Sequence, residues 1–453
     1  MFRTWQTLAR GVRRLSRAAG RGGGTTLPGR MLLRVEPRAL ERMTGDLDRG
    51  AVVISATNGK TTMAAMVAAI LSEAGQPVVH NHAGSNMAWG VATALLDAER
   101  GSGQLGLLEV DEAWLPTVAR AVRPRTYLLA NLFRDQLDRY GELELIADRW
   151  AELVAEDAGR ARFVLNADDP LVADLGRGHD GAVYFGVDDD SQALAELGHA
   201  ADSKHCRNCG TPYAYEAILL GHMGHYRCPG CGRERPAPHV AARAVELQGM
   251  SGARFTLCTP EGELDAQLPV PGLYNVYNAV GATALALELG ASLEQVRAAL
   301  SRFGGAFGRV ETIEVGSRRL SILLGKNPAG ANEVLRTLTL EDGELDLWIA
   351  LNDGIADGRD VSWIWDADFE VLAGHVRHVT CSGTRAEEMA LRLKYAGIEA
   401  SLEVDRDLSR SLDAAVAANG GGVRTLYALP TYTALIELRE LLARRGLAGR
   451  WAD

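Results

Sequence analysis

The sequence predicts an α/β protein with two consecutive doubly wound domains, and three observations support this fold class. Short apolar runs alternate with helical patterns from residue 50 onward, as they do in parallel sheets whose strands are joined by helices. The first of these runs ends in a turn that is equipped to hold a triphosphate. A polar, cysteine-containing segment at about 188–238 interrupts the alternation, and a second alternating series begins after residue 310.

Length and composition are those of a globular protein. The 453 residues are enough for two to four domains, and 47% hydrophobic with 23% charged residues is an ordinary balance. No apolar run reaches the roughly 18 residues that span a bilayer, and no secretory signal is evident. We therefore expect a soluble, cytoplasmic protein.

Residues 1–44 form a basic N-terminal segment. Nine arginines and one acidic residue, Glu36, precede residue 39, so this part carries +8 and the rest carries −18 of the net −10. Apolar residues recur every three or four positions between Phe2 and Ala19, which predicts a basic amphipathic helix. Such a helix can lie on an anionic membrane surface, here the inner face of the plasma membrane, or it can pack on its own protein.

The first domain is expected over residues 45–310. Its predicted strands are 51–56, 77–80, 106–110, 126–131, 162–166 and 182–187. Helices are predicted at 63–74 and 87–98, and strand-like pieces at 240–270 precede an Ala-rich helix at 275–289.

The turn after the first strand reads Thr57-Asn58-Gly59-Lys60-Thr61-Thr62. Backbone N–H groups at the start of the following helix favour phosphate, Lys60 would reach the β- and γ-phosphates, and Thr61 would bind Mg²⁺. The general phosphate-loop motif also has a glycine five residues before Gly59, where this chain has Ile54. The alternative interpretation is a strand-to-helix turn with a surface lysine, but the strand before it and the apolar helix after it favour a nucleotide site.

Four cysteines in the insertion predict a structural zinc site. Two CxxC pairs, Cys206 with Cys209 and Cys228 with Cys231, are each followed by glycine and are separated by eighteen residues. Two such pairs complete a tetrahedral shell that leaves no position for water, so we expect a zinc ribbon at about 200–238. Disulfides are the competing interpretation, which a reducing cytosol disfavours. Cys258 and Cys381 are expected to be buried, inert thiols.

The second domain is expected over residues 311–453. Its predicted strands are 319–324, 345–351, 376–381, 398–404 and 424–429, with helices between them. This order is typical of a Rossmann-like α/β domain.

An ordered set of motifs resembles the Mur ligase family of ATP-dependent amide-forming enzymes. The set comprises the turn at 57–62, Glu109 at the end of a predicted strand, the Asn131 segment, Asn166-Ala167-Asp168-Asp169 and Tyr274-Asn275-Val276-Tyr277-Asn278-Ala279. The resemblance implies that Glu109 joins Thr61 at Mg²⁺, that Asn278 contacts adenine and that Arg309 contacts the nucleotide. Alone, each asparagine would more often cap a helix or a turn.

A narrower resemblance is to the MurT family within the Mur ligases, and it covers nearly the whole chain. It rests on the segments 131–141, 326–330 and 352–366, and on the inserted four-cysteine ribbon. Gln136 stands where amino-acid-adding Mur ligases tend to have histidine. Two departures, Ala56 in place of a glycine and Leu323 in place of an aspartate that contacts ribose, concern nucleotide geometry.

The MurT resemblance implies a glutamine-dependent carbon–nitrogen ligase of peptidoglycan synthesis. Such proteins amidate the α-carboxylate of D-Glu in the lipid II stem peptide through an acyl phosphate, with ammonia from a GatD-type glutaminase subunit. Asp360 is expected to complete the catalytic triad of that glutaminase, with Asp353 and Asp357 as the alternatives. Trp363 and Trp365 fit an interface anchor, although the loop can also simply cap a nearby helix.

Two other functions compete with this one. A Mur or folylpolyglutamate-type ligase would add an amino acid directly, but the zinc insertion and the Asp360 loop argue against it. A zinc-ribbon ATPase that binds nucleic acid would need a basic surface, whereas the body of this chain is acidic.

Overall fold

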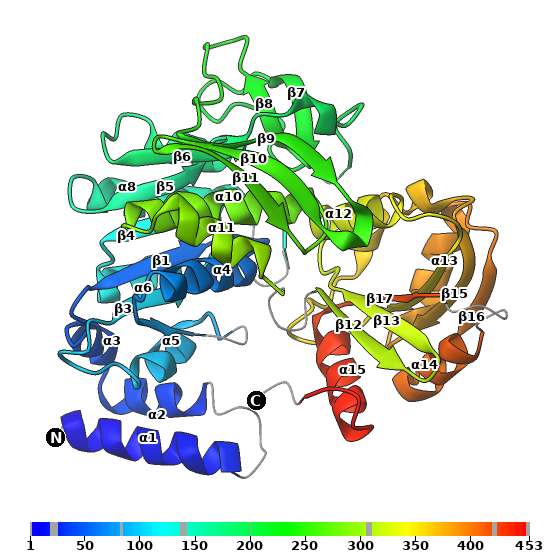
Figure 1. Cartoon of the computed structure of the whole chain (residues 1–453), viewed down its shortest axis with the longest axis horizontal. Coiled ribbons are helices and arrows are strands. Elements are labelled where there is room, and N and C mark those ends of the chain that lie inside the picture. Colours follow the sequence, from blue (N-terminus) through cyan, green and yellow to red (C-terminus); the bar gives the residue numbers. More distant parts are fainter. Residues whose placement is uncertain are drawn as a thin grey trace.

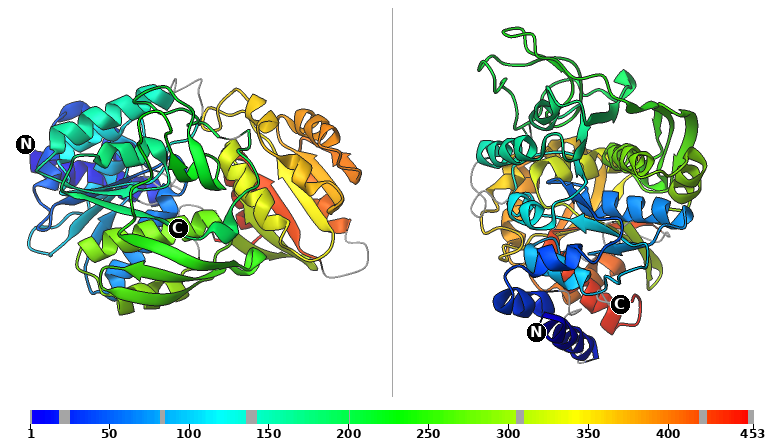
Figure 2. Two further views of the ribbon diagram at one scale, coloured as in Figure 1. Left: turned by 90° about the horizontal axis from the view of Figure 1, so that it is seen from above. Right: turned by 90° about the vertical axis from the view of Figure 1, so that its left-hand side faces the viewer.

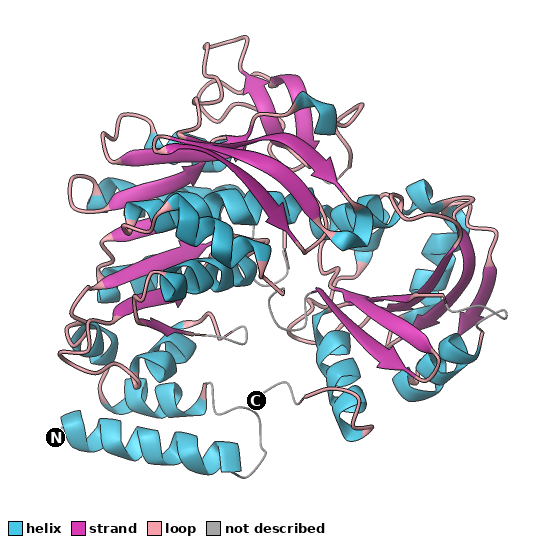
Figure 3. Ribbon diagram, in the orientation of Figure 1, coloured by secondary structure: helices cyan, strands magenta, loops and turns pink. Residues whose placement is uncertain are grey.

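Two mostly parallel sheets form the framework of the chain (Figures 1 and 3). The computed structural model describes residues 2–18, 26–81, 85–135, 143–199, 201–304, 310–418 and 424–449. The first sheet has nine strands in the order β11-β10-β9-β6-β5-β4-β1-β3-β2, and the second has six in the order β12-β13-β17-β14-β15-β16. The α/β fold class predicted from the sequence is confirmed.

The first sheet contains all six strands that its apolar runs predict. Its parallel strands are β1 (Ala51–Ser55), β2 (Val78–His80), β3 (Leu105–Glu109), β4 (Thr126–Leu129), β5 (Arg162–Asn166), β6 (Ala182–Val187) and β9 (Val240–Leu247). Two antiparallel strands, β10 (Ala253–Thr259) and β11 (Gly262–Leu268), extend one edge.

Helices cover both faces of this sheet, which explains why its central strands β1, β3 and β4 are buried at every position. On β1, Val52 and Ile54 pack into one core with α4 (Lys60–Glu73), α10 (Leu273–Glu288) and α11 (Leu293–Ser301). Val53 points to the opposite face. The helices on that side are α3 (Ala39–Thr44), α5 (Ala88–Leu95), α6 (Leu115–Val122), α8 (Leu143–Asp157) and α9 (Pro170–Ala173).

The basic N-terminal segment begins with two helices, α1 (Phe2–Ala18) and α2 (Leu27–Val35), at one end of the molecule, and it ends with α3 (Figures 1 and 2). The predicted amphipathic helix is therefore present. Nε of Arg10 donates to the carbonyl of Leu96 at 2.7 Å, and Arg13 pairs with Asp97 at 2.6 Å, so α1 packs on its own protein. Among the described residues, no helix is both long enough and apolar enough to cross a bilayer.

The polar insertion carries a two-stranded hairpin, β7 (Ala214–Leu220) and β8 (Met223–Arg227), at the opposite end from α1 (Figure 2). Short 3₁₀ turns accompany the first sheet at Asp174–Gly176, Asp190–Gln192 and Gly249–Ser251. The hairpin is a sheet of its own, and its apolar residues pack into the cores of the first domain.

The second sheet contains the five strands predicted from the sequence and one that was missed. The predicted strands appear as β13 (Arg318–Leu323), β14 (Leu345–Ala350), β15 (Val376–Ser382), β16 (Ser401–Val404) and β17 (Leu426–Pro430). The missed strand, β12 (Val310–Val315), is an antiparallel edge strand whose sequence, Val-Glu-Thr-Ile-Glu-Val, has no continuous apolar run. The domain boundary near residue 310 stays a prediction.

Four helices and two 3₁₀ turns pack on the second sheet. They are α12 (Pro328–Leu338), α13 (Ala386–Tyr395), α14 (Leu408–Ala417), α15 (Tyr432–Arg444), η4 (Ser362–Trp365) and η5 (Phe369–Leu372). Cys381 is buried in β15, as expected, whereas Cys258 on β10 is only partly buried.

Candidate active site at the phosphate loop

The turn between β1 and α4 has the backbone geometry of a phosphate cradle. Gly59 adopts a φ of +87° at the N-cap of α4 and leaves the first N–H groups of the helix exposed to a ligand. A Cβ atom at Gly59 would lie 2.1 Å from Oδ1 of Asn278 on α10. Glycine is therefore required here both by conformation and by the close approach of Asn278.

Asn131, at the end of β4, holds this loop in place. Its Oδ1 accepts from the N–H of Asn58 at 2.9 Å, and its Nδ2 donates to the carbonyl of Asn58 at 2.9 Å. The carbonyl of Asn131 accepts from the N–H of Thr57 at 3.0 Å. These three contacts fix the backbone of the loop from the neighbouring strand.

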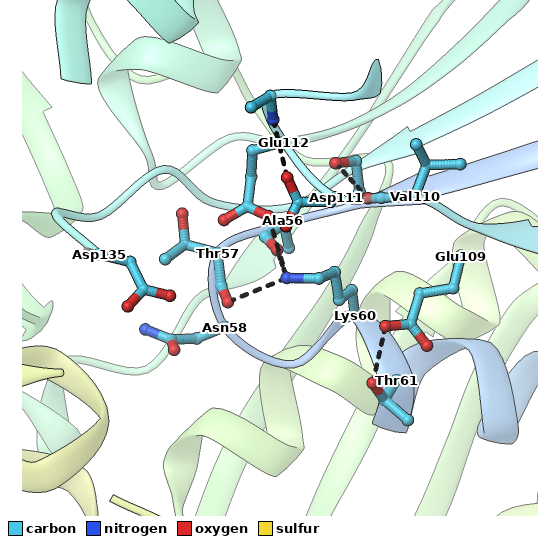
Figure 4. A network of polar contacts seen from close by, with 12 residues as sticks. Ala56, Thr57, Asn58, Lys60, Thr61, Glu109, Val110, Asp111, Glu112 and Asp135 are labelled. Atoms are coloured by element: carbon cyan, nitrogen blue, oxygen red, sulfur yellow. Dashed lines mark hydrogen bonds and ion pairs between the residues drawn. The ribbon is translucent and has the colours of Figure 1, made fainter. Parts of the chain in front are cut away.

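Lys60 is buried beneath the loop (Figure 4). Its Nζ donates to the carbonyl of Ala56 at 2.9 Å and lies 2.9 Å from Oε2 of Glu112. Burial alone would lower the pKa of Lys60, but the carboxylates of Glu112, Asp111 and Glu109 more than offset burial and raise it. Lys60 therefore remains positively charged where the phosphates of a nucleotide would lie.

Glu112 and Asp111 are two acidic neighbours of Lys60 whose pKa values shift in opposite directions. Burial would raise the pKa of Glu112, but the Lys60 ammonium lowers it below its usual range. Burial and the neighbouring Glu112 raise the pKa of Asp111 to about 6. The sequence interpretation missed both residues, although the run Glu109-Val110-Asp111-Glu112 at a strand end places three carboxyl groups in four residues.

Glu109 and Thr61 meet as the magnesium prediction requires. Oγ1 of Thr61 donates to Oε1 of Glu109 at 2.8 Å (Figure 4). The side chain of Asn81 makes two hydrogen bonds to the Glu109 backbone. It accepts from the Glu109 N–H at 2.8 Å and donates to the Glu109 carbonyl at 2.7 Å. The second carboxylate oxygen, Oε2 of Glu109, is buried and accepts no hydrogen bond from the described residues. A carboxylate and a hydroxyl with a buried, unsatisfied oxygen fit a Mg²⁺ ion.

A cleft of about 870 Å³, including its open mouth, extends from the loop between the two domains. The predicted residues Asn58, Gly59, Thr62 and Asn278 line it. Residues of the second domain form the facing wall, and these are Leu324, Lys326, Ala329, Gly330, Glu333 and Val334. This mixed polar and apolar lining, which begins at the phosphate loop, suits a nucleotide.

Two charged residues of this second wall were not singled out from the sequence. Lys326 forms an ion pair with Asp135 of the first domain. Glu333 is buried, and desolvation raises the pKa of its carboxyl group to about 7. The ion-pair partner of Lys326 is 191 residues away, and the burial of Glu333 depends on tertiary packing, so sequence alone assigned neither residue a role.

Two predicted features fall outside the described residues. They are Arg309 and residues 136–141 of the Asn131 segment, including Gln136. The other predicted nucleotide-site residues, 57–62, Glu109 and Asn278, all lie around one loop and one cleft.

The four insertion cysteines gather as the zinc prediction requires. Their sulfur atoms all lie within 4.8 Å of one another, with Sγ–Sγ separations of 3.6 Å for Cys206–Cys231 and 3.4 Å for Cys209–Cys228. Tetrahedral thiolate coordination of zinc gives sulfur separations of about 3.8 Å. The cluster therefore fits a closed structural zinc site.

The three acidic candidates at the end of β14 differ in exposure. Asp357 is buried and accepts from the N–H of Thr433 at 2.8 Å, and Asp353 contacts Thr384 and Arg385. Asp360 is exposed, and its Oδ1 accepts from the N–H of Ser362 at 2.9 Å, at the start of η4. Hydrogen bonds from Ser362 lower the pKa of Asp360. Asp360 thus contacts the first residue of η4 through a carboxylate that solvent can reach, whereas the N-cap residue itself is Val361 and makes no side-chain capping hydrogen bond.

Comparisons with known proteins identify the family. The Mur ligase middle domain matches residues 54–228, and the MurT ligase C-terminal domain matches residues 324–435. A lipid II isoglutaminyl synthase (glutamine-hydrolyzing) subunit MurT of Staphylococcus aureus is 34% identical over 98% of both chains. The chain belongs to the MurT family of Mur ligases. A MurT subunit of Streptococcus pneumoniae is 33% identical over 94% of this chain and 93% of its own.

Solved structures share the fold at low sequence identity. A pseudomurein peptide ligase type C from Methanothermus fervidus aligns with a TM-score of 0.68 at 22% identity, covering 89% of this chain and 80% of its own. MurF ligase from Thermotoga maritima, solved in complex with ADP, aligns with a TM-score of 0.64 at 13% identity, covering 91% and 84%. The predicted Mur ligase fold is confirmed.

Proposed function

We propose that this MurT-family chain amidates the α-carboxylate of D-Glu in the lipid II stem peptide to D-isoglutamine, using ATP, Mg²⁺ and ammonia. The observation that carries the proposal is the buried Lys60 and the Thr61–Glu109 pair at a phosphate loop that opens into the interdomain cleft. The curated relatives over nearly the full length are named as MurT subunits of lipid II isoglutaminyl synthase, which supports this reaction over amino-acid addition.

The reaction needs two steps because a carboxylate is a poor electrophile. A carboxylate oxygen attacks the γ-phosphorus of ATP and ADP leaves, which gives an acyl phosphate. Ammonia then attacks the acyl carbon, loses a proton and expels inorganic phosphate, which leaves the amide. Both steps depend mainly on positioning and on compensation of phosphate charge.

The residues of the site contribute to different parts of this reaction. Lys60, kept charged by the surrounding carboxylates, stabilises negative charge on the transferring phosphoryl group. Thr61 and Glu109 would hold Mg²⁺, which supplies charge neutralisation at the phosphates when it is bound. Asn278 would contact adenine, and Arg309 is proposed to contact the nucleotide. The zinc ribbon is proposed to be structural.

Ammonia is proposed to come from a GatD-type glutaminase partner in a heterodimer. Asp360 is the proposed triad carboxylate because it is exposed, whereas Asp357 is buried against Thr433 and Asp353 is held by Thr384 and Arg385. A triad carboxylate orients the histidine base of the nucleophile. Two exposed aromatic residues, Trp365 and Tyr395, pack edge-to-face with ring centroids 5.7 Å apart and suit a protein interface.

The proposed location is the cytoplasmic face of the plasma membrane, with domain bounds of 1–44, 45–310 and 311–453. ATP use and a reduced cysteine cluster favour the cytoplasm. Apolar side chains of α1 and α2 face solvent among exposed arginines, and they are Trp5, Leu8, Leu27, Met31 and Val35. Exposed apolar and basic side chains together suit an anionic lipid surface.

This location can be tested with anionic vesicles. Replacing the exposed Arg30 and Arg34 by glutamate should abolish cosedimentation, whereas replacing Arg319 and Arg424 of the second domain should not. Equal binding by both variants would contradict the proposed membrane surface.

The proposed reaction is tested by the mass of the product. The chain is incubated with ATP, lipid II and either ammonium or free amino acids. Amidation exchanges a hydroxyl group for an amino group and barely changes the mass, whereas amino-acid addition adds a whole residue. Amidation with ammonium supports the proposal, and addition of an amino acid would overturn it.

A further inference from the structure

The tip of the β7–β8 hairpin forms part of the wall of the interdomain cleft. Leu220 and Met223 flank the hairpin turn, and both line the cleft together with Val270 and Tyr277. They are 5% and 1% exposed, respectively. The insertion thus supplies an apolar surface in the same cleft that the polar phosphate loop lines, and the flat face of a nucleobase suits such a surface.

The hairpin turn is anchored to the residues that support the phosphate loop. His222, between Leu220 and Met223, is fully buried and packs on Phe133 with ring centroids 4.6 Å apart. Its Nε2 faces Oδ2 of Asp169 at 3.5 Å. The same carboxylate oxygen accepts from the N–H of Leu132 at 2.9 Å, and Leu132 directly follows Asn131, which holds the loop.

A second anchor joins the hairpin to the helix that carries Asn278. The N–H of Gly224 donates to the carbonyl of Asp168 at 2.9 Å, and Nε of Arg235 lies 2.5 Å from Oδ1 of Asp168. The hydroxyl of Tyr277 on α10 donates to Oδ2 of Asp168 at 2.7 Å. Asp168 therefore fixes the position of the insertion relative to α10 at the cleft.

A third anchor reaches the second domain. Arg336 on α12 donates to the carbonyl of Leu219 at 3.1 Å and to the carbonyl of Gln192 at 2.7 Å. The hairpin thus contacts both domains that enclose the cleft. At its other end, β8 leads directly into Cys228 of the cysteine cluster, so the cluster holds the base of the hairpin whose tip lines the cleft.

We propose that Leu220 and Met223 form the surface against which the base of the bound nucleotide rests, and that an intact zinc ribbon is required for tight nucleotide binding. The ribbon then acts as a positioning element of the nucleotide site in addition to its structural role. The inference rests on the proposed use of ATP, and it concerns the nucleoside end of the ligand, whereas the phosphate loop binds the other end.

The test compares a nucleotide with a ligand that lacks the base. Binding of MgATP and of inorganic tripolyphosphate is measured by titration calorimetry for the full chain, without any turnover. Met223→Ala and Leu220→Ala should weaken MgATP roughly tenfold, the order expected for loss of one apolar contact surface, and leave tripolyphosphate unchanged. Met31→Ala, at an exposed methionine on α2, is the matched control and should change neither.

A second variant tests the coupling to zinc. Cys209→Ser should lower the zinc content and weaken MgATP more than tripolyphosphate, whereas Lys204→Ala, at an exposed ribbon residue, should keep both zinc and affinity. Unchanged MgATP affinity in the hairpin-tip variants, or equal loss of both ligands, would overturn the inference. Failure of the wild-type chain to bind MgATP at all would instead contradict the proposed function.

Discussion

The ammonium group of Lys60 lies 2.9 Å from Oε2 of Glu112, and both side chains are almost completely buried beneath the phosphate loop. The pair keeps a positive charge at the phosphate site even though burial disfavours it. Because a buried charge without its partner is costly, this relationship predicts strong energetic coupling between the two residues.

Lys60→Met and Glu112→Gln should each lower the free energy of unfolding, by up to about 3 kcal/mol, because each leaves a buried group without its partner. The double variant should lose clearly less than the two single losses added together. Denaturation of the four proteins without nucleotide measures this coupling. Strictly additive losses would show that the pair is not coupled.

Gly59→Ala should strongly weaken triphosphate binding, because its Cβ would collide with Oδ1 of Asn278 in the cradle. We expect a loss of at least about tenfold in affinity, comparable to losing one charge-assisted hydrogen bond. Gly75→Ala is the matched control, since Gly75 also has a positive φ of +65° but an open space around its Cβ position. Both variants should carry similar backbone strain, so equal tripolyphosphate binding by the two would contradict the crowding argument.

The sequence was sufficient to predict those parts of the site that are local in the chain. The turn at 57–62 and the strand that ends at Glu109 follow from apolar runs and residue order, and the four-cysteine cluster follows from the spacing of its cysteines. Glu112, Glu333 and the hairpin tip were missed because their roles depend on contacts between distant segments. Strand β12 was missed because an edge strand with one solvated face has no continuous apolar run.

Glu333→Gln should stabilise the nucleotide-free chain, and more at pH 8 than at pH 5.5. Burial raises the pKa of the Glu333 carboxyl group from 4.5 to about 7, so the folded state holds this proton more tightly than the unfolded state. The wild type therefore loses stability as the pH rises between these values, by up to about 3 kcal/mol, and no more above them. Melting temperatures of the wild type and the variant at the two pH values measure this difference in stability. A stabilisation by Glu333→Gln that does not change with pH would show that Glu333 does not titrate with a raised pKa.

Asp360→Asn should leave ammonium-driven amidation intact and abolish the glutamine-driven reaction of the complex with its glutaminase partner. The reason is that the carboxylate would orient a histidine of the partner and takes no part in phosphoryl transfer. Asp342→Asn, at an exposed aspartate of the same domain, should affect neither reaction. Loss of both reactions in the Asp360 variant would assign that residue to the ligase site or to folding instead.

The position of the nitrogen that the reaction adds distinguishes α-carboxylate amidation from amidation at any other carboxyl group. Lipid II is incubated with the chain, ATP, Mg²⁺ and isotopically labelled ammonium, and the stem peptide is fragmented in a mass spectrometer. We expect one labelled nitrogen, located on the α-carboxyl group of D-Glu, and no label when ATP is omitted. A label at another carboxyl group, or an unlabelled peptide in the complete mixture, would contradict it.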